Sequence, residues 1–372
     1  MKKTLLTLAA LLGFAANVCA QTWNMVITRT DGTTETLKTT DVKDVTFVPE
    51  DRNADQVIIK ELYNGGCPLD NGSGYFQGDK GFILYNNSKE TAVLSNLCVG
   101  TLDPYNAHGS NKWYQDGRLT YEEQGFVPAI DGIWYFPSPL VIEPYSQVVV
   151  SCMGAIDNTA AYSQSVNYAN ADYYAMYDPE SGYNNTRNYP TPSEVIPTSH
   201  YLKAIRVGQA NSWTLSVMAP AFFLFQTKGT TPQAFAADAG NIVYAPGEAQ
   251  TAPNRCLKVP TEWVIDGIEV YMSGKESASQ KRFTADVDAG NVVLTNKLGH
   301  TLYRNVDLTA TEALPENAGK LVTGYALGVT TGDPSGIDAE ASIRKGAHIV
   351  YLDTNNSSAD FHERRQFSLR DK

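Results

Sequence analysis

Most of the chain consists of short apolar runs separated by turn-forming residues. β-Branched and aromatic residues dominate runs at 56–66, 81–87, 91–100, 140–154, 213–226 and 263–272. Gly, Pro, Asn and Asp punctuate these runs, and little of the sequence has the 3.6-residue periodicity of an amphipathic helix. With 29 glycines and 18 prolines, this pattern predicts an all-β fold, an antiparallel sandwich or barrel rather than alternating β–α units.

The N-terminal part of the chain has a different pattern. Residues 1–20 combine two lysines with an apolar run and a small-residue end before Gln21, which is typical of a secretory signal peptide. Cys19 offers an alternative, a lipid anchor, although the residues before it lack the usual leucine and small-residue run. No other stretch has the 18 or more apolar residues of a transmembrane span. We therefore expect an exported protein, located in the periplasm, at the outer-membrane surface or outside the cell.

Two units are expected after the signal. Residues 21–49 predict a small β-hairpin unit, with Asp31 and Gly32 at its turn, and residues 50–56 a polar linker. Residues 57–372 are long enough for one large domain with a substantial core.

The charge of the chain argues against nucleic acid as a partner. There are 29 basic and 40 acidic residues, and loss of Lys2 and Lys3 with the signal would take the net charge from −11 to −13. A chain this acidic, without a basic run, lacks the electrostatic footprint that DNA or RNA requires.

Four cysteines would remain after cleavage. In an exported chain they can oxidise, and Cys67 with Cys98 is the preferred disulfide because both follow neighbouring strand-like segments. The alternative is that Cys67, Cys98, Cys152 and Cys256 are buried thiols that act as small hydrophobes.

The segment DTNNSSADFHER, at 353–364, is the clearest candidate for a metal site. Asp353, Asn355, Ser357 and Asp360 are spaced so that a curled loop can turn several oxygens toward one Ca²⁺. The same residue types also form turns that cap their own backbone, and the glycine and final glutamate of an EF-hand loop are missing. We therefore expect a structural turn, with calcium as the alternative and no other cofactor.

Catalytic templates are missing from the sequence. His362 and Glu363 are not followed by the second histidine of an HExxH zinc site, and no GxSxG elbow, GxxxxGK[ST] loop or GxGxxG follows a strand. We expect no enzymatic activity. The alternative is a glycan-active or ester hydrolase whose site forms only in three dimensions.

Several motifs in order carry a resemblance to known proteins. KGFILYNNS (80–88), IEPYSQVVVS (142–151), WVIDGIEVY (263–271) and GHTLYR (299–304) are similar to strands of the lamin-tail fold, an immunoglobulin-like sandwich. Together with VIIKELYNGG and DTNNSSADFHER they resemble a Bacteroidetes family of exported proteins known as domain of unknown function 4876. The resemblance spans roughly residues 57–372 and implies a lamin-tail-like β-sandwich.

Two long connections are the expected binding surface. Residues 101–139 and 155–212 far exceed the usual length between strands, and such loops tend to be functional. Their tyrosines lie among Asn and Ser, a composition typical of binding surfaces. The rings can equally cover one face of the sandwich and form a small additional core there, the roofing interpretation. The expected contact residues are aromatic: Trp113, Tyr114, Trp134, Tyr173, Tyr174 and Tyr177.

These expectations define one function and two alternatives. We expect a non-catalytic binding or accessory protein of the cell envelope, with an envelope protein or glycan as partner. It would serve an outer-membrane transporter or a surface assembly. The alternatives are the hydrolase and a purely structural surface protein, and the sequence specifies neither ligand nor oligomeric state.

Overall fold

A computed structural model describes residues 23–370 except 44, 46–49, 214, 330 and 331. The expected signal at 1–20 and Cys19 lie outside the described residues. The chain divides into two units, residues 1–48 and 49–372. In the first unit, β1 (Asn24–Thr28) and β2 (Thr34–Lys38) form an antiparallel hairpin. Its turn contains Gly32 at a φ of 84°, where a residue with a side chain would be strained.

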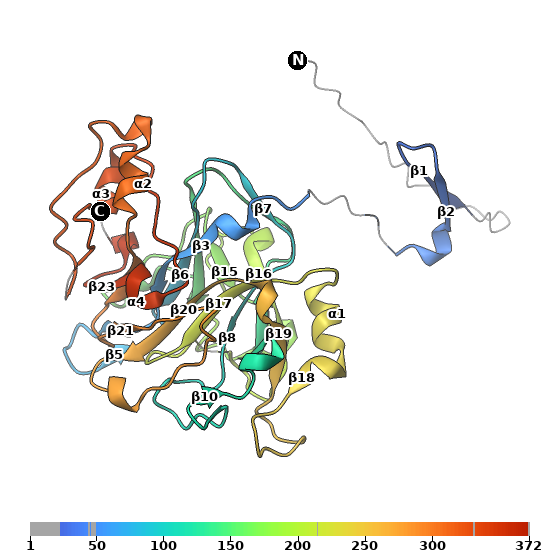
Figure 1. The fold of residues 1–372 in the computed structure, drawn as a ribbon, viewed down its shortest axis with the longest axis horizontal. Coiled ribbons are helices and arrows are strands. Elements are labelled where there is room, and N and C mark those ends of the chain that lie inside the picture. Colours follow the sequence, from blue (N-terminus) through green and yellow to red (C-terminus); the bar gives the residue numbers. More distant parts are fainter. Residues whose placement is uncertain (1–22, 44, 46–49, 214, 330–331, 371–372) are drawn as a thin grey trace. The chain divides into compact units, whose positions relative to one another are not determined.

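The second unit is built on one large mixed sheet (Figure 1). In spatial order its strands are β21 (Val292–Leu294), β20 (Val264–Met272), β17 (Ala221–Gln226), β8 (Leu97–Thr101), β12 (Gly132–Tyr135), β16 (Tyr201–Arg206), β15 (Tyr174–Met176), β14 (Gln147–Met153), β6 (Lys80–Asn86), β3 (Val57–Tyr63), β22 (Thr301–Arg304) and β23 (Phe361–Arg364). Most pairs are antiparallel, but β15 runs parallel to both of its neighbours and β21 runs parallel to β20.

The sheet curls until its two edges nearly meet. Glu363 on β23 accepts a hydrogen bond of 2.8 Å from the backbone nitrogen of Thr295, which directly follows β21. Further in from the two edges, Asp266 on β20 accepts a hydrogen bond of 2.6 Å from the backbone nitrogen of Ile59 on β3. The all-β class is confirmed. The immunoglobulin-like sandwich is not, because the strands join a single mixed, nearly closed sheet rather than two separate antiparallel ones.

The core fills the interior of the curled sheet and continues on its outer faces. Inside, Phe82 on β6 meets Phe222 on β17, with ring centroids 4.9 Å apart. Strands of this kind are buried on both faces, which explains why their sequences are continuous apolar runs. Along β3, Ile59 joins the interior and Ile58 the outer layer. The register shifts between Ile59 and Glu61, so Lys60 is the extra residue of a β-bulge.

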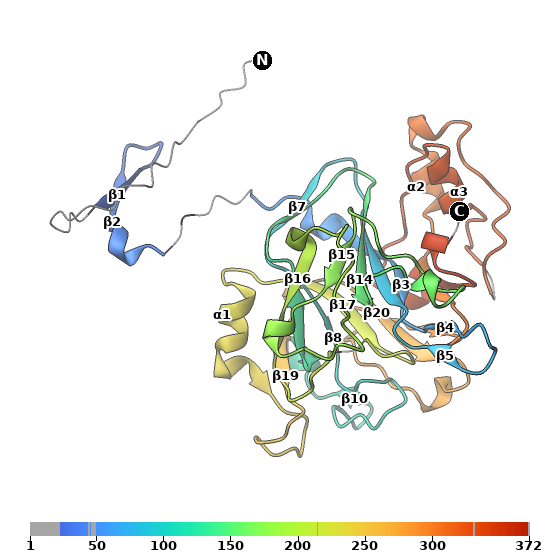
Figure 2. The same ribbon diagram turned by 180° about the vertical axis from the view of Figure 1, so that it is seen from behind.

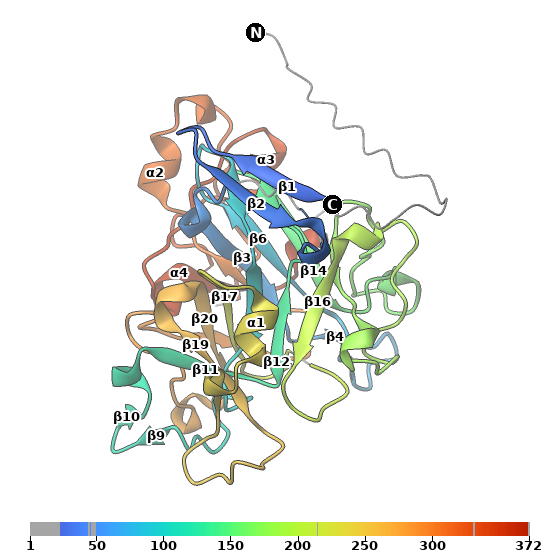
Figure 3. The ribbon, with the colours of Figure 1, turned by 90° about the vertical axis from the view of Figure 1, so that its right-hand side faces the viewer.

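Short elements cover the outer faces (Figures 1 and 3). On one side lie α1 (Pro232–Ala237) and the small sheet of β11 (Phe126–Ile130), β19 (Cys256–Pro260) and β18 (Ile242–Val243). The other side carries α2 (Leu308–Glu312) and α3 (Ala339–Arg344), followed in the chain by α4 (Ser357–Asp360). Three small two-stranded sheets complete the unit: β4 (Cys67–Pro68) with β5 (Tyr75–Phe76), β7 (Ala92–Leu94) with β13 (Leu140–Ile142), and β9 (Tyr114–Gln115) with β10 (Arg118–Leu119).

Candidate ligand-binding site

A cavity of about 560 Å³ lies between the β4–β5 hairpin and the second long insertion, 155–212. Figure 2 shows the green part of this insertion beside β4 and β5. The hairpin contributes Tyr75, Phe76 and Gln77, and the insertion contributes Tyr162, Asn185, Arg187 and Asn188. The cavity therefore joins segments that are about 90 residues or more apart in the chain.

The geometry of the hairpin depends on two glycines. Gly66 has a φ of 71°, and a Cβ atom there would lie 2.5 Å from the carbonyl oxygen of Phe76. A Cβ atom on Gly78 would lie 2.9 Å from the ring of Phe76. Only glycine leaves room for the backbone at the first position and for the aromatic ring at the second. The Phe76 ring consequently folds over Gly78 toward the insertion.

Two contacts hold the insertion against the hairpin. Phe76 stacks on Tyr162, with ring centroids 4.1 Å apart and an interplanar angle of 16°. Asp70, in the hairpin loop, accepts hydrogen bonds from the backbone nitrogen of Ser163 at 3.0 Å and from its hydroxyl at 2.7 Å. The stack and the carboxylate fix neighbouring residues of the insertion, so the walls of the cavity are built before any ligand enters.

Several polar side chains that line this cavity have hydrogen-bond donors or acceptors that other described residues do not use. The side-chain oxygen of Asn185 accepts from the backbone nitrogen of Arg187 at 3.1 Å, and the Asn188 amide donates to Ser212. Among the residues that the structure describes, the guanidinium of Arg187 and the amide of Gln77 make no hydrogen bond or ion pair. Both side chains are on exposed residues, and no described Asp or Glu lines the cavity. A ligand therefore meets a cation and several amide groups without a competing carboxylate.

A second cavity, of about 410 Å³, is lined by other residues of the second insertion, including Ser163, next to Tyr162 in the chain. Ser163, Asn170, Tyr173 and Arg370 are among its lining residues. Tyr173 is half-buried there, and it is the one predicted contact residue that lines either of these two cavities.

The other tyrosines predicted for the second insertion pack against neighbouring rings. Tyr174, in β15, stacks on His200 with centroids 4.2 Å apart and meets Phe136 edge-on at 5.3 Å. Tyr177 meets Tyr201 edge-on at 5.5 Å. These rings are half-buried, which favours the roofing interpretation over the contact surface.

The predicted residues of the first insertion lie elsewhere. Trp134 is fully buried in the interior beside Tyr183, and Trp113 is 3% exposed with its indole nitrogen donating to Asp103 at 2.6 Å. Tyr114 is half-buried in β9. The structure therefore does not gather the six aromatic residues on one surface, because the tryptophans fill core positions.

Sequence reasoning missed Tyr75, Phe76, Tyr162 and Arg187. The hairpin and the insertion are too far apart in sequence for any spacing rule to join them. One local signal was present: the turn-forming run Asn71-Gly72-Ser73-Gly74 leads directly into two aromatic residues.

The 353–360 segment directs its oxygens toward protein donors. Asp360 accepts from the backbone nitrogen of Thr354 at 2.9 Å and from its hydroxyl at 2.8 Å, and Asp353 pairs with Arg304 at 3.1 Å. The side chain of Asn355 instead lines a separate small cavity. Within the described part of the chain, no group of three or more His, Cys, Asp or Glu side chains is arranged to hold a metal ion.

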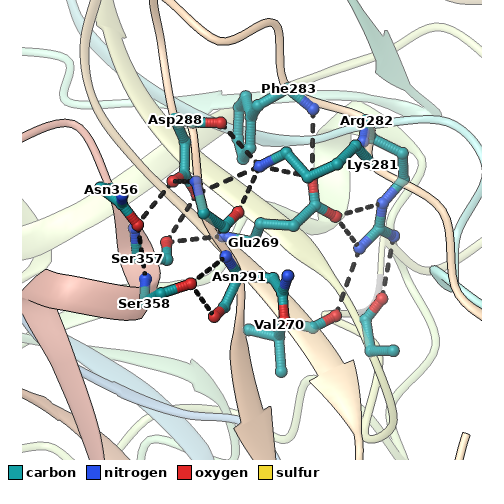
Figure 4. Close-up of polar contacts among 12 residues, drawn as sticks. Glu269, Val270, Lys281, Arg282, Phe283, Asp288, Asn291, Asn356, Ser357 and Ser358 are labelled. Atoms are coloured by element: carbon teal, nitrogen blue, oxygen red, sulfur yellow. Dashed lines mark hydrogen bonds and ion pairs between the residues drawn. The ribbon is translucent and has the colours of Figure 1, made fainter. Parts of the chain in front are cut away.

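Ser357 belongs to a buried polar network on β20 (Figure 4). Its hydroxyl donates to Asp288 at 2.6 Å and accepts from the backbone nitrogen of Glu269 at 3.1 Å. Arg282 pairs with Glu269 at 2.6 Å, and Lys281 donates to the backbone oxygen of Asp288 at 2.6 Å. Burial raises the pKa of Asp288 and lowers that of Lys281. Because Ser357 is 1% exposed and its hydroxyl is used twice, this serine is a structural anchor rather than a nucleophile.

The four described cysteines are free and buried. The Cys67–Cys98 disulfide, the pair preferred if any disulfide forms, is not present. Cys67 lies in the β4–β5 hairpin, whereas Cys98 lies in β8 of the large sheet and packs into its outer layer. Burial raises the pKa of each thiol, to about 12 for Cys152. These cysteines match the alternative of small hydrophobic side chains.

Comparisons with known proteins give a family and a fold. Residues 143–368 match the family described as "Protein of unknown function (DUF4876)". A crystal structure of a DUF4876 family protein from Bacteroides thetaiotaomicron VPI-5482 is similar, with a TM-score of 0.58 and 18% identity over 82% of this chain and 70% of that chain. At this identity the likeness concerns the fold alone.

No curated protein matches the chain. No helix in the described residues has the length and apolar character needed to cross a bilayer.

Proposed function

The chain belongs to the DUF4876 family of proteins of unknown function, and from this premise we propose that it is a non-catalytic binding protein. Its ligand site is the cavity between the β4–β5 hairpin and the second insertion. The observation that carries the proposal is the cavity itself, whose preformed walls include two polar side chains, Arg187 and Gln77, without a partner among the described residues. A concave, largely preformed site with a few placed polar groups is typical of ligand binding.

Catalysis has weaker support. The hydrolase alternative needs two carboxyl groups of raised pKa that face each other across one cavity. Burial raises the pKa of both Glu61 and Asp266. Glu61, on β3, accepts a hydrogen bond from Ser368. Asp266, on β20, accepts one from Ile59 and pairs with Arg304.

We place this binding function at the cell envelope. The support is the signal-like pattern of residues 1–20, and the partner would be a glycan or protein of the envelope. In that setting the protein would serve an outer-membrane transporter or a surface assembly as an accessory module.

A variant that fills the cavity tests the proposal. Gln77 is exposed and has no partner among the described side chains, so Gln77→Trp adds a bulky ring at the cavity without removing a contact. Gln124→Trp, in the first insertion, places the same ring at an exposed position outside the cavity described here. We expect immobilised parent protein and Q124W, but not Q77W, to retain the same component of a Bacteroidetes envelope extract, identified by mass spectrometry and sugar analysis. Equal retention by all three proteins, or by none, would contradict the proposal.

A further inference from the structure

The chemistry of the cavity points to an acidic saccharide, a sugar chain that carries carboxylate groups, as the ligand class. This inference rests on the proposed function and adds the identity of the ligand. It follows from three properties of the cavity: its charge, its hydrogen-bonding groups and its aromatic surface.

The charge of the cavity is opposite to that of the molecule. The chain carries a net charge of −11, yet Arg187 is the charged residue of the cavity and no described carboxylate lines it. Some described arginines, at 29, 118, 282 and 304, pair with an Asp or Glu, whereas Arg187, like the exposed Arg344, forms no ion pair with a described residue. An unpaired guanidinium presents a planar fork of donors that matches a carboxylate in geometry and charge. Arg187 therefore favours an anionic ligand.

Besides Tyr75 and Tyr162, the neutral polar side chains of the cavity are amides. Gln77, Asn185 and Asn188 come from both walls of the cavity, and each primary amide carries both donor and acceptor groups. Adjacent hydroxyls of a sugar ring also donate and accept, so one amide can bind two of them at once. Three amides around one cation suit a ligand with many hydroxyls and few charges.

The apolar part of the cavity is mainly aromatic. Tyr75 and the stacked rings of Phe76 and Tyr162 line it, together with Leu69 and Met153. One face of a pyranose ring exposes only C–H groups and can lie against an aromatic ring.

Paired sugar probes test the ligand class. The probes are an array of uronic-acid oligosaccharides, each printed beside the same oligosaccharide with its carboxylates reduced to alcohols. The proteins are the parent, Arg187→Gln and Arg344→Gln, which makes the same charge change at an exposed position at the end of α3. We expect the parent and R344Q to bind at least one acidic probe, and to bind its reduced counterpart about three- to tenfold more weakly. R187Q should bind that probe about three- to tenfold more weakly, the range for one solvent-accessible charged contact.

The outcomes separate this inference from the proposed function. Equal binding of acidic and reduced probes, or equal binding by R187Q and R344Q, overturns the acidic ligand class. Absence of binding to every probe also overturns it. In each of these cases the proposed function stands if Q77W still loses the envelope component that Q124W retains. If that component is also retained by Q77W, the cavity is not the binding site and both proposals fall.

Discussion

Lys60 and Glu61 lie on the same face of β3 because a bulge interrupts the alternation of the strand. The ammonium group of Lys60 is buried and lies 2.7 Å from a carboxylate oxygen of Glu340, in α3. Glu61 accepts a hydrogen bond of 3.0 Å from the backbone nitrogen of Ser368. These two residues therefore connect the sheet to separate parts of the C-terminal segment.

The titration of Glu61 gives a prediction at this scale. Burial raises its pKa from 4.5 to about 7, although Arg364 and the Ser368 hydroxyl act to lower it. Because the folded protein holds this proton more tightly than the unfolded chain, the contribution of Glu61 to stability is fully present below about pH 4.5. It is lost as the pH rises to about 7, by an amount on the order of 3 kcal/mol.

Glu61→Gln, which stays neutral at every pH, isolates this contribution. We expect the free energy of unfolding, measured with urea, to fall less between pH 5 and pH 7.5 in E61Q than in the parent. The same pH dependence in both proteins would contradict the raised pKa. Comparing the two proteins cancels the titration of other buried carboxyls, such as Asp79 and Asp333, whose pKa burial also raises.

Among the elements, the 353–360 segment is stabilised by its own carboxylates. Asp360 binds Thr354, and Asp353 binds Arg304, which is buried between several acidic partners. Replacing both aspartates by Ala leaves backbone donors and part of the arginine charge without partners. We expect a loss of about 2–4 kcal/mol, measured by thermal unfolding, and the same loss with EDTA or with millimolar Ca²⁺. If Ca²⁺ raised the Tm of the parent but not of the double variant, the segment would be an ion site.

The tyrosines of the second insertion can be ranked by their ring contacts. Tyr174 and Tyr177 each meet other aromatic rings, whereas Tyr173 lines the smaller cavity. We expect Tyr174→Ser combined with Tyr177→Ser to lower the free energy of unfolding by about 3 kcal/mol or more. Tyr173→Ser alone should cost about 1 kcal/mol, as for a less enclosed residue. A larger effect from Tyr173 in urea unfolding would mean that this ranking is wrong.

The individual strands were largely predictable from sequence, but their partners were not. The runs at 56–66, 81–87 and 263–272 contain β3, most of β6 and all of β20, because strands buried on both faces need continuous apolar residues. By contrast, β15 is three residues long and lies among Asn- and Tyr-rich sequence. Its place in the sheet depends on parallel pairing with β14 and β16, which no local pattern encodes.

At the scale of the whole molecule, closure of the sheet depends on contacts between distant residues. Asp266 and Ile59 are 207 residues apart, and sequence alone predicts neither this contact nor the resulting shape. The cavity has the same origin, since Phe76 and Tyr162 meet only when the hairpin and the insertion are both in place. Family membership was predictable because its motifs are local and occur in a fixed order. The site was not, because it forms between segments.

The buried cysteines can report the order in which parts of the protein unfold. A thiol inside a protein reacts with an alkylating reagent only while its surroundings are open. Cys152 lies in the interior of the curled sheet. Cys98 lies in the outer cluster between the large sheet and the β11–β18–β19 layer, and Cys256 is part of that layer, in β19. If that layer detaches before the sheet opens, mass spectrometry of timed samples will show Cys98 and Cys256 modified first. Equal rates of modification at all three cysteines would mean that the layers open in one cooperative event. In either case the native cysteines report the order of unfolding, and no probe has to be introduced.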